Sequence, residues 1–224
     1  NYQLETISTQ EASFYFQVNR SNSNLNLPLN KNTENTAARD NTLSDMAMGW
    51  AVKNITVDGW ASPEGEETFN QDLSMKRAET ATNYMEKKVV KAAKKNELIE
   101  ADLWEGIEVV ETANGPDWNG FMRAVEASDI KDKNAIINVI NSAGTSAEKE
   151  AEIRNMILIY PELERDILPP LRRAVIDVNT YEPKKSAELI ADLAVTGPQE
   201  LDIEELHYAA TLTDDNGTKR VIYA

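Results

Sequence analysis

The stretch Ile55–Ala81 reads ITVDGWASPEGEETFNQDLSMKRAETA and contains a strand, a turn and the start of a long helix. Apolar and polar residues alternate over 53–60, as in a strand with one buried face. Pro and Gly follow at 61–65, which is typical of a turn. From 66 to 93 apolar residues recur at helical spacing, with acidic residues first and lysines last, as the helix dipole favours. The sequence therefore predicts a strand joined by a short turn to a helix.

Polar side chains on this predicted helix point to a binding site. Asn70, Ser74 and Arg77 stand at i, i+4 and i+7, so they share one stripe of the helix. The stripe adjoins the apolar side, which lets Arg77 bury its stem and direct its guanidinium towards the strand ends. The first-turn N–H groups face the same corner, and an arginine fork beside them suits a carboxylate ligand. In the alternative interpretation, Arg77 is solvated or ion-paired and Asn70 braces the turn.

Further strands and helices are predicted on both sides of this stretch. Residues 1–11 are polar and aperiodic, and we expect an N-terminal arm there. The Asn- and Ser-rich segment 19–36 is interpreted as a loop, and 37–50 has helical spacing. Alternation predicts three more strands, at 13–18, 106–111 and 173–179. Strands that alternate with helices imply crossover connections, with the helices on a face of one sheet.

Two regions of the chain have only helical patterns. The first, about 115–170, lies between the last two predicted strands and should form a small helical core, with a protein-docking face as the alternative. Its helices are predicted at 118–127, 132–142 and 146–160, the last with a cap at Thr145. The second region, 183–224, is predicted to hold helices at 186–194 and 198–212. It is interpreted as a C-terminal helical extension, or as the first unit of a tetratricopeptide-like array.

The composition excludes several classes of function. Lys and Arg number 23 and Asp and Glu 38, so the net charge is −15, which opposes binding to nucleic acid or to anionic lipid. There is no cysteine, so no thiolate metal site is expected. The one histidine, His207, is interpreted as structural, and a His-rich metal site is excluded. We expect no cofactor. No apolar run is long enough to span a membrane. The chain starts at Asn1 and ends on an apolar segment, so we expect a fragment of a longer protein.

Several motifs resemble the OmpA C-terminal domain family, whose members attach to peptidoglycan in Gram-negative envelopes. A strand ending in Gly59-Trp60 and a loop with Gly65 precede the helix, and the family's closing strand resembles the segment 172–176, Arg-Arg-Ala-Val-Ile. The helix itself carries the family's spaced residues, at Asn70, Leu73, Ser74, Arg77 and Ala78. The resemblance covers roughly 12–111 and 171–180. It implies an α+β fold, a βαβαββ two-layer sandwich, over 12–181, with the helical insertion between its last two strands.

The resemblance also implies a ligand, the diaminopimelate residue of a peptidoglycan stem peptide. In the family an Asp three residues after the strand-end Gly grips the ligand's ammonium, and the Arg that matches Arg77 grips its carboxylate. Ser62 stands at that Asp position here, and we favour Glu64 as the substitute charge over Glu66 or Asp58. The candidate site is the set Ala61, Ser62, Glu64, Asn70, Ser74 and Arg77.

The predicted function is therefore an envelope binding module, on the periplasmic side of the outer membrane, with any signal or lipid anchor upstream of Asn1. The alternative is an OmpA-like scaffold that has lost peptidoglycan binding and contacts envelope proteins. A third possibility is a carboxylate-pair glycosidase, but the sequence has no Gly-x-Ser-x-Gly, P-loop or His-Glu-x-x-His spacing, so we expect no enzymatic activity.

Overall fold

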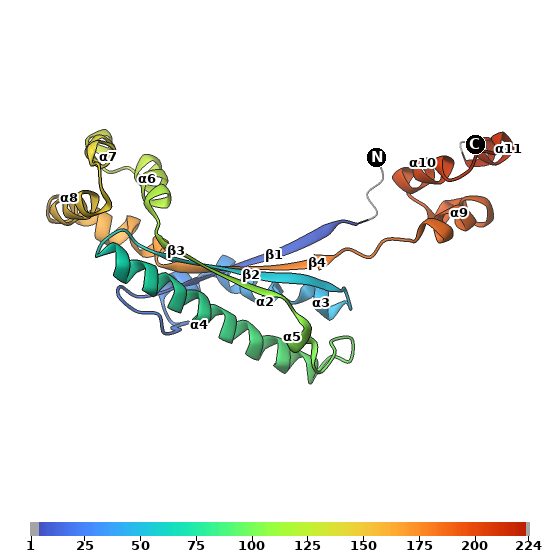
Figure 1. Ribbon diagram of the computed structural model, residues 1–224, viewed down its shortest axis with the longest axis horizontal. Helices are drawn as coiled ribbons and strands as arrows, with labels where there is room; N and C mark the ends of the chain where they lie inside the picture. Colours follow the sequence, from blue (N-terminus) through green and yellow to red (C-terminus); the bar gives the residue numbers. More distant parts are fainter. Residues whose placement is uncertain (1–4, 223–224) are drawn as a thin grey trace. The chain divides into compact units, whose positions relative to one another are not determined.

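The computed structural model describes residues 5–222, which divide into one compact unit, Thr9–Thr180, and a second that contains residues 5–8 and 181–222. Figure 1 shows the elements along the chain. The strands are β1 (Ile7–Tyr15), β2 (Val52–Ala61), β3 (Val109–Pro116) and β4 (Arg173–Tyr181). The helices before β4 are α1 (Pro28–Lys31), α2 (Thr33–Asn41), α3 (Ser44–Ala47), α4 (Glu67–Ala93), α5 (Leu103–Gly106), α6 (Trp118–Ala127), α7 (Lys133–Ser142), α8 (Ser146–Ile159), the π-helical turn η1 (Leu163–Ile167) and the 3₁₀ turn η2 (Pro169–Leu171).

The four strands form one sheet in the order β1-β4-β2-β3. β2 runs parallel to β3, with Ile55 opposite Val109, and antiparallel to β4, with Val57 opposite Ile176. Helices connect β1 to β2 and β2 to β3, and further helices lie between β3 and β4. The α+β fold with βαβαββ order and a helical insertion, predicted from the sequence, is confirmed.

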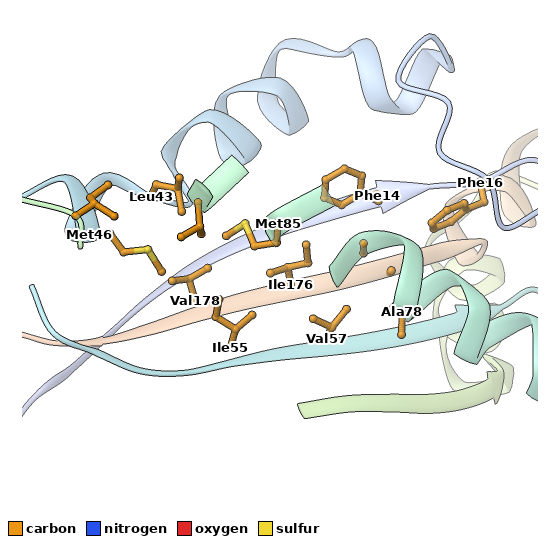
Figure 2. Packing of buried hydrophobic residues seen from close by; sticks show 14 residues of the cluster. Phe14, Phe16, Leu43, Met46, Ile55, Val57, Ala78, Met85, Ile176 and Val178 are labelled. Atoms are coloured by element: carbon orange, nitrogen blue, oxygen red, sulfur yellow. The ribbon is translucent and has the colours of Figure 1, made fainter. Parts of the chain in front are cut away.

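One face of the sheet carries the main core, and the helices α3 and α4 pack on it (Figure 2). Ile55 and Val57 of β2 are fully buried, as the alternating pattern predicts. Ala81 and Met85 of α4 contribute from the helix side. The helix is 27 residues long, and its buried residues run from Asn70 to Val89, so packing on the sheet stabilises most of its length.

Gly59 sets how closely α4 approaches the sheet. A Cβ added at Gly59 would lie 1.9 Å from the backbone O of Ser74, so only glycine fits under the helix at this point. The close approach brings the end of β2 next to the first turns of α4. This is the part of the fold that contains the candidate site.

Some element boundaries differ from the prediction. β1 begins at Ile7 instead of Ser13, so residues 7–11 of the expected arm belong to the sheet, while residues 1–4 lie outside the described part. These residues were missed because their side chains are polar and the strand is held by its neighbour: the Thr9 hydroxyl donates to Asn179 Oδ1 at 2.6 Å. The strand ends at Tyr15, so Val18 of the predicted strand 13–18 lies beyond it and is 48% exposed.

The region before β2 also differs. Instead of a loop followed by one helix at 37–50, α1, α2 and α3 are short and consecutive. Asn32 caps α2, because its side chain accepts the Asn35 N–H, so the helix starts four residues earlier than predicted. Gly49 has a φ of +80°, which ends the helical segment before Trp50.

β3 is the other strand that was misplaced. It was predicted at 106–111 and spans Val109–Pro116, because its pairing with β2 continues to Ala61 opposite Pro116. The residues before it form α5 instead. This later end of β3 places Gly115 beside α4.

The helical insertion matches its prediction closely. α6, α7 and α8 begin and end within one residue of the expected bounds, and the Thr145 cap is confirmed as a capping box with Glu148. A separate cluster of apolar side chains, including Phe121, Ile140 and Ile153, fills the space between these helices. The insertion therefore has a core of its own.

The second unit contains α9 (Ala187–Thr196), the 3₁₀ turn η3 (Pro198–Glu200), α10 (Ile203–Thr211) and α11 (Asn216–Ile222). The predicted helix 198–212 is divided, because Asp202 forms a capping box with Glu205 and starts a new helix. Gly217 lies within α11. Ile190, Ala209 and Ile222 share a small core. Residues 223–224 of the expected extension lie outside the described part, and the array interpretation stays a prediction.

The second face of the sheet carries polar residues, and one of them is an acid in an unfavourable place. Asp177 of β4 lies opposite Thr56, whose hydroxyl hydrogen bonds to its carboxylate. Burial, followed by the negative charges of Glu11 and Asp58, raises the pKa of Asp177 above its ordinary value of 3.8. Its Oδ1 is buried and has no hydrogen-bond partner among the described residues.

The substitution Gly59→Ala should lower the free energy of unfolding by about 3 kcal/mol, because the new methyl group overlaps the Ser74 carbonyl and the helix must shift. Urea unfolding followed by circular dichroism measures this. Gly106→Ala is the matched control: its Cβ meets nothing within 4 Å, and the change should stay within about 1 kcal/mol. Equal effects of the two substitutions would contradict the close approach.

The substitution Asp177→Asn should stabilise the protein at pH 7, by less than about 1 kcal/mol because the side chain is partly exposed. Folding raises the pKa of Asp177, so at pH values above 3.8 its carboxyl group holds a proton more often in the native than in the unfolded state. The free energy of unfolding therefore falls as the pH rises from 3.8 through the native pKa. The advantage of the variant should therefore shrink as the pH falls to 4. Unfolding curves at several pH values test this, with the exposed Glu100→Gln as the control for net charge.

Candidate functional site

The structure brings the predicted site residues together where β2 ends and α4 begins. Ala61 is the last residue of β2, Ser62 and Glu64 lie in the loop that follows, and Asn70 is near the start of α4. Ser74 and Arg77 follow on the same helix. The residues Ala61, Ser62, Asn70, Ser74 and Arg77 are each at most 5% exposed, and Glu64 is half-buried. The helical stripe expected from their spacing therefore faces inward.

Asn70 holds the loop in its conformation. Its Nδ2 donates to the carbonyls of Ser62, at 3.3 Å, and of Gly65, at 3.2 Å. Gly65 has a φ of +109°, a backbone conformation that favours glycine. These contacts match the alternative interpretation in which Asn70 braces the turn.

Ser74 and Ala61 connect this loop to its surroundings. The Ser74 hydroxyl donates to the Gln71 carbonyl at 2.7 Å and accepts the Gly115 N–H at 3.0 Å. The Ala61 carbonyl accepts the N–H of Asp117, at 2.8 Å. Both residues therefore fix the end of β3 and the start of the insertion against the site. Their polar groups are used within the protein.

Arg77 is the most deeply buried charge of the site, at 1% exposure. Its Nη1 donates to the carbonyl of Trp60 at 2.8 Å, so the guanidinium faces the end of β2, as expected. Its Nε donates to Arg20 O at 3.0 Å and its Nη2 to Gln17 O at 3.2 Å. The guanidinium carbon lies 5.4 Å from the centre of the Phe16 ring. Arg77 thus joins three backbone segments.

Burial and, to a lesser extent, the positive charge of Arg172 lower the pKa of Arg77, Glu64 opposes the shift, and the resulting pKa is about 9. The pKa remains above neutral pH, so the guanidinium is charged. Such a buried charge is tolerated only when it is hydrogen bonded, and the three carbonyls supply those bonds.

Glu64 forms an ion pair with Arg172, the residue before β4. Arg172 was not in the predicted set of site residues. Its Nη2 lies 2.6 Å and its Nε 3.1 Å from Glu64 Oε1. The same Nε donates to the Ser62 hydroxyl at 3.2 Å. The signal for Arg172 was present in the sequence, in the Arg-Arg pair that opens the closing strand, but nothing in the sequence linked it to Glu64.

The second carboxylate oxygen of Glu64 lacks a hydrogen-bond donor within the described part of the chain. Glu64 Oε2 is buried and has no hydrogen-bond partner among residues 5–222. A buried acceptor without a donor costs about 1–3 kcal/mol, so such atoms are rare in folded proteins. With Arg77 and Arg172 against one carboxylate, the site has a net charge of +1. The site therefore contains Glu64 Oε2, an acceptor without a donor among the described residues, beside two guanidinium groups.

A second ion pair connects the site to the insertion. Arg173 Nη1 lies 2.8 Å from Asp117 Oδ2, and its guanidinium carbon lies 5.3 Å from the Trp60 ring centre. Asp117 is the N-cap of α6, since its Oδ1 accepts the Gly120 N–H at 2.7 Å. The strand that closes the sheet and the first helix of the insertion are thereby held together at the site. Sequence reasoning had no signal for this pair.

Neither a metal centre nor a membrane span emerges from the described part of the chain. No group of three or more His, Cys, Asp or Glu side chains there is arranged to hold a metal ion. None of its helices is both long enough and apolar enough to cross a membrane.

No family model and no curated protein matches the chain. Among solved structures, the chain is similar to the OmpA-like domain of FopA1 from Francisella tularensis subsp. tularensis SCHU S4. The two are 15% identical, the match covers 81% of this chain and 82% of that chain, and the TM-score is 0.35. A likeness of this degree does not decide a family or a function.

A double-mutant cycle on Glu64→Gln and Arg172→Gln should give a coupling of about 1.5–3 kcal/mol, because each single change leaves the partner charge buried and unpaired. Chemical unfolding of the wild type, both single variants and the double variant measures this. The exposed pair Arg165 and Asp166 is the control and should show a much smaller coupling. Strictly additive effects at Glu64 and Arg172 would exclude the ion pair.

Proposed function

We propose that this chain is a cell-envelope binding module that holds a peptidoglycan stem peptide non-covalently, through the zwitterionic end of its diaminopimelate residue. The observation that supports this most directly is the unpartnered, buried Glu64 Oε2, in a site that also contains Arg172 and Arg77. The site thus has a carboxylate oxygen that lacks a donor from the described residues, beside a surplus of positive charge.

The ammonium of the ligand would bind Glu64 Oε2 and the ligand's carboxylate would share the guanidinium of Arg172. Hydrogen bonds that involve charged groups contribute about 1.5–3 kcal/mol each, enough for a binding constant that can be measured. Arg77 would act on the carboxylate through its positive charge, because three of its donors are taken up by backbone carbonyls.

The exchange of Asp for Ser at position 62 does not remove the negative charge from the site. Glu64, two residues later in the same loop, forms an ion pair with the Arg172 guanidinium. The Ser62 hydroxyl accepts a second hydrogen bond from the same arginine. This supports the preference for Glu64 over Asp58, which instead accepts a hydrogen bond from Asn114 at 2.9 Å.

One observation favours the alternative, a scaffold without peptidoglycan binding. Arg77 is inaccessible, and its donors bond to three backbone carbonyls, so its side chain holds the loops without contacting a ligand. For either function we place the chain on the periplasmic side of a Gram-negative outer membrane, with partners in the envelope. We propose no catalytic activity.

A stem peptide that contains diaminopimelate should bind the purified chain, and Glu64→Gln should weaken the affinity by about ten- to a hundredfold, because the ligand's ammonium loses its carboxylate. Calorimetric titration, or chemical shifts of the amides at 61–65 in NMR spectra, measures this. A peptide with lysine in place of diaminopimelate should bind more weakly, since it has no second carboxylate for Arg172.

Glu67→Gln is the matched control, because Glu67 is exposed at the start of α4 and its loss changes the net charge equally. It should bind like the wild type. If millimolar peptide produces no heat and no shifts at 61–65, the peptidoglycan proposal fails and the scaffold alternative stands.

A further inference from the structure

A groove of about 640 Å³ lies beside the candidate site and shares Arg172 with it. One wall comes from the end of β1 and the segment that follows, with Tyr15, Val18 and Leu29. The other wall comes from the end of the helical insertion, with Pro169 and Pro170. The groove therefore exists only because this chain has an insertion between β3 and β4.

The charged side chains on the groove walls are all ion-paired. Arg165 and Asp166, at its rim, form an ion pair with Nη2 and Oδ2 2.8 Å apart. The remaining charge on its walls is Arg172, which already pairs with Glu64. A neutral, apolar occupant fits these walls better than a charged one.

The walls are held in place by buried hydrogen bonds. The Asn30 side chain accepts the Tyr15 N–H at 2.9 Å and donates to the carbonyls of Tyr15, at 2.8 Å, and Asn24, at 3.0 Å. The Phe16 N–H donates to the Arg172 carbonyl at 2.7 Å and joins the two walls. A groove that is formed before the ligand arrives loses little free energy in ordering.

Arg77 links the groove to the site. The carbonyls that it binds include Gln17, on the groove wall, and Trp60, at the end of β2. It thereby fixes the groove wall relative to the loop of Glu64. Arg77 is in this sense a positioning residue for both.

We propose that this groove binds the small apolar residue that neighbours the zwitterionic residue in the same peptide, as the alanine next to diaminopimelate does in a stem peptide. The inference rests on the proposed function and adds that affinity comes from two adjacent places, the charged site and the groove. A methyl-bearing residue next to the zwitterion lies against Val18, Leu29 and the two prolines while the zwitterion contacts Glu64 and Arg172.

Two matched ligands test the groove: diaminopimelate monoamide, and diaminopimelyl-D-alanine amide, which has one alanine residue more. The second should bind the wild type about five- to tenfold more tightly, the gain expected from burying a methyl group and a short stretch of backbone. The double variant Val18→Asn, Leu29→Asn keeps the charge at Arg172 and should reduce this ratio to about one. Leu158→Asn, at a position on α8 that is 83% exposed and outside the groove, should retain the ratio.

The outcomes separate the two proposals. Equal affinity of the wild type for both ligands would overturn the groove and leave the proposed function intact. A ratio that persists in the double variant would also overturn the groove, provided that circular dichroism shows the variant is folded. If neither ligand binds, the proposed function fails, and the groove inference fails with it.

Discussion

The structure around the site depends on one buried cation. Arg77 is 1% exposed and donates to the carbonyls of Gln17 and Arg20, in the loop after β1, and of Trp60, at the end of β2. A buried guanidinium needs several acceptors, and these carbonyls supply them. Removing the charge would take one donor from each carbonyl, of which Gln17 O also accepts the Arg20 N–H at 3.1 Å. The loop after β1 and the end of β2 are therefore fixed relative to α4 by the same side chain.

The roles of the arginines are thus divided. Arg77 gives the site its shape, and Arg172, at the start of β4, provides the guanidinium that contacts Glu64. The division follows from depth, because Arg77 is surrounded by backbone and Arg172 lies next to a half-buried loop. The deeper charge of Arg77 thus holds the loops, while Arg172 holds the Glu64 carboxylate.

The helical insertion has a structural consequence for the site in addition to its own core. Its first helix is capped by Asp117, which also pairs with Arg173 of the closing strand, and its last turns supply Pro169 and Pro170 beside Arg172. Both ends of the insertion therefore meet the sheet at the end where β2 stops. An insertion at this point can alter what the site contacts without changing the sheet, because the strand order and register are set by the buried face of the strands.

The sequence by itself determined the order of strands and helices, the buried alternation at Ile55 and Val57, the long helix with its inward stripe, and the bounds of α6–α8. These are local patterns, which propensity and periodicity set within a few residues. Tertiary structure alone decided the early start of β1 at Ile7, the later end of β3 and the pairing of Glu64 with Arg172, which lie 108 residues apart in the chain. The position of Arg77 on its helix was readable from spacing, but its three carbonyl partners were not, because they come from segments that only the folded sheet brings together.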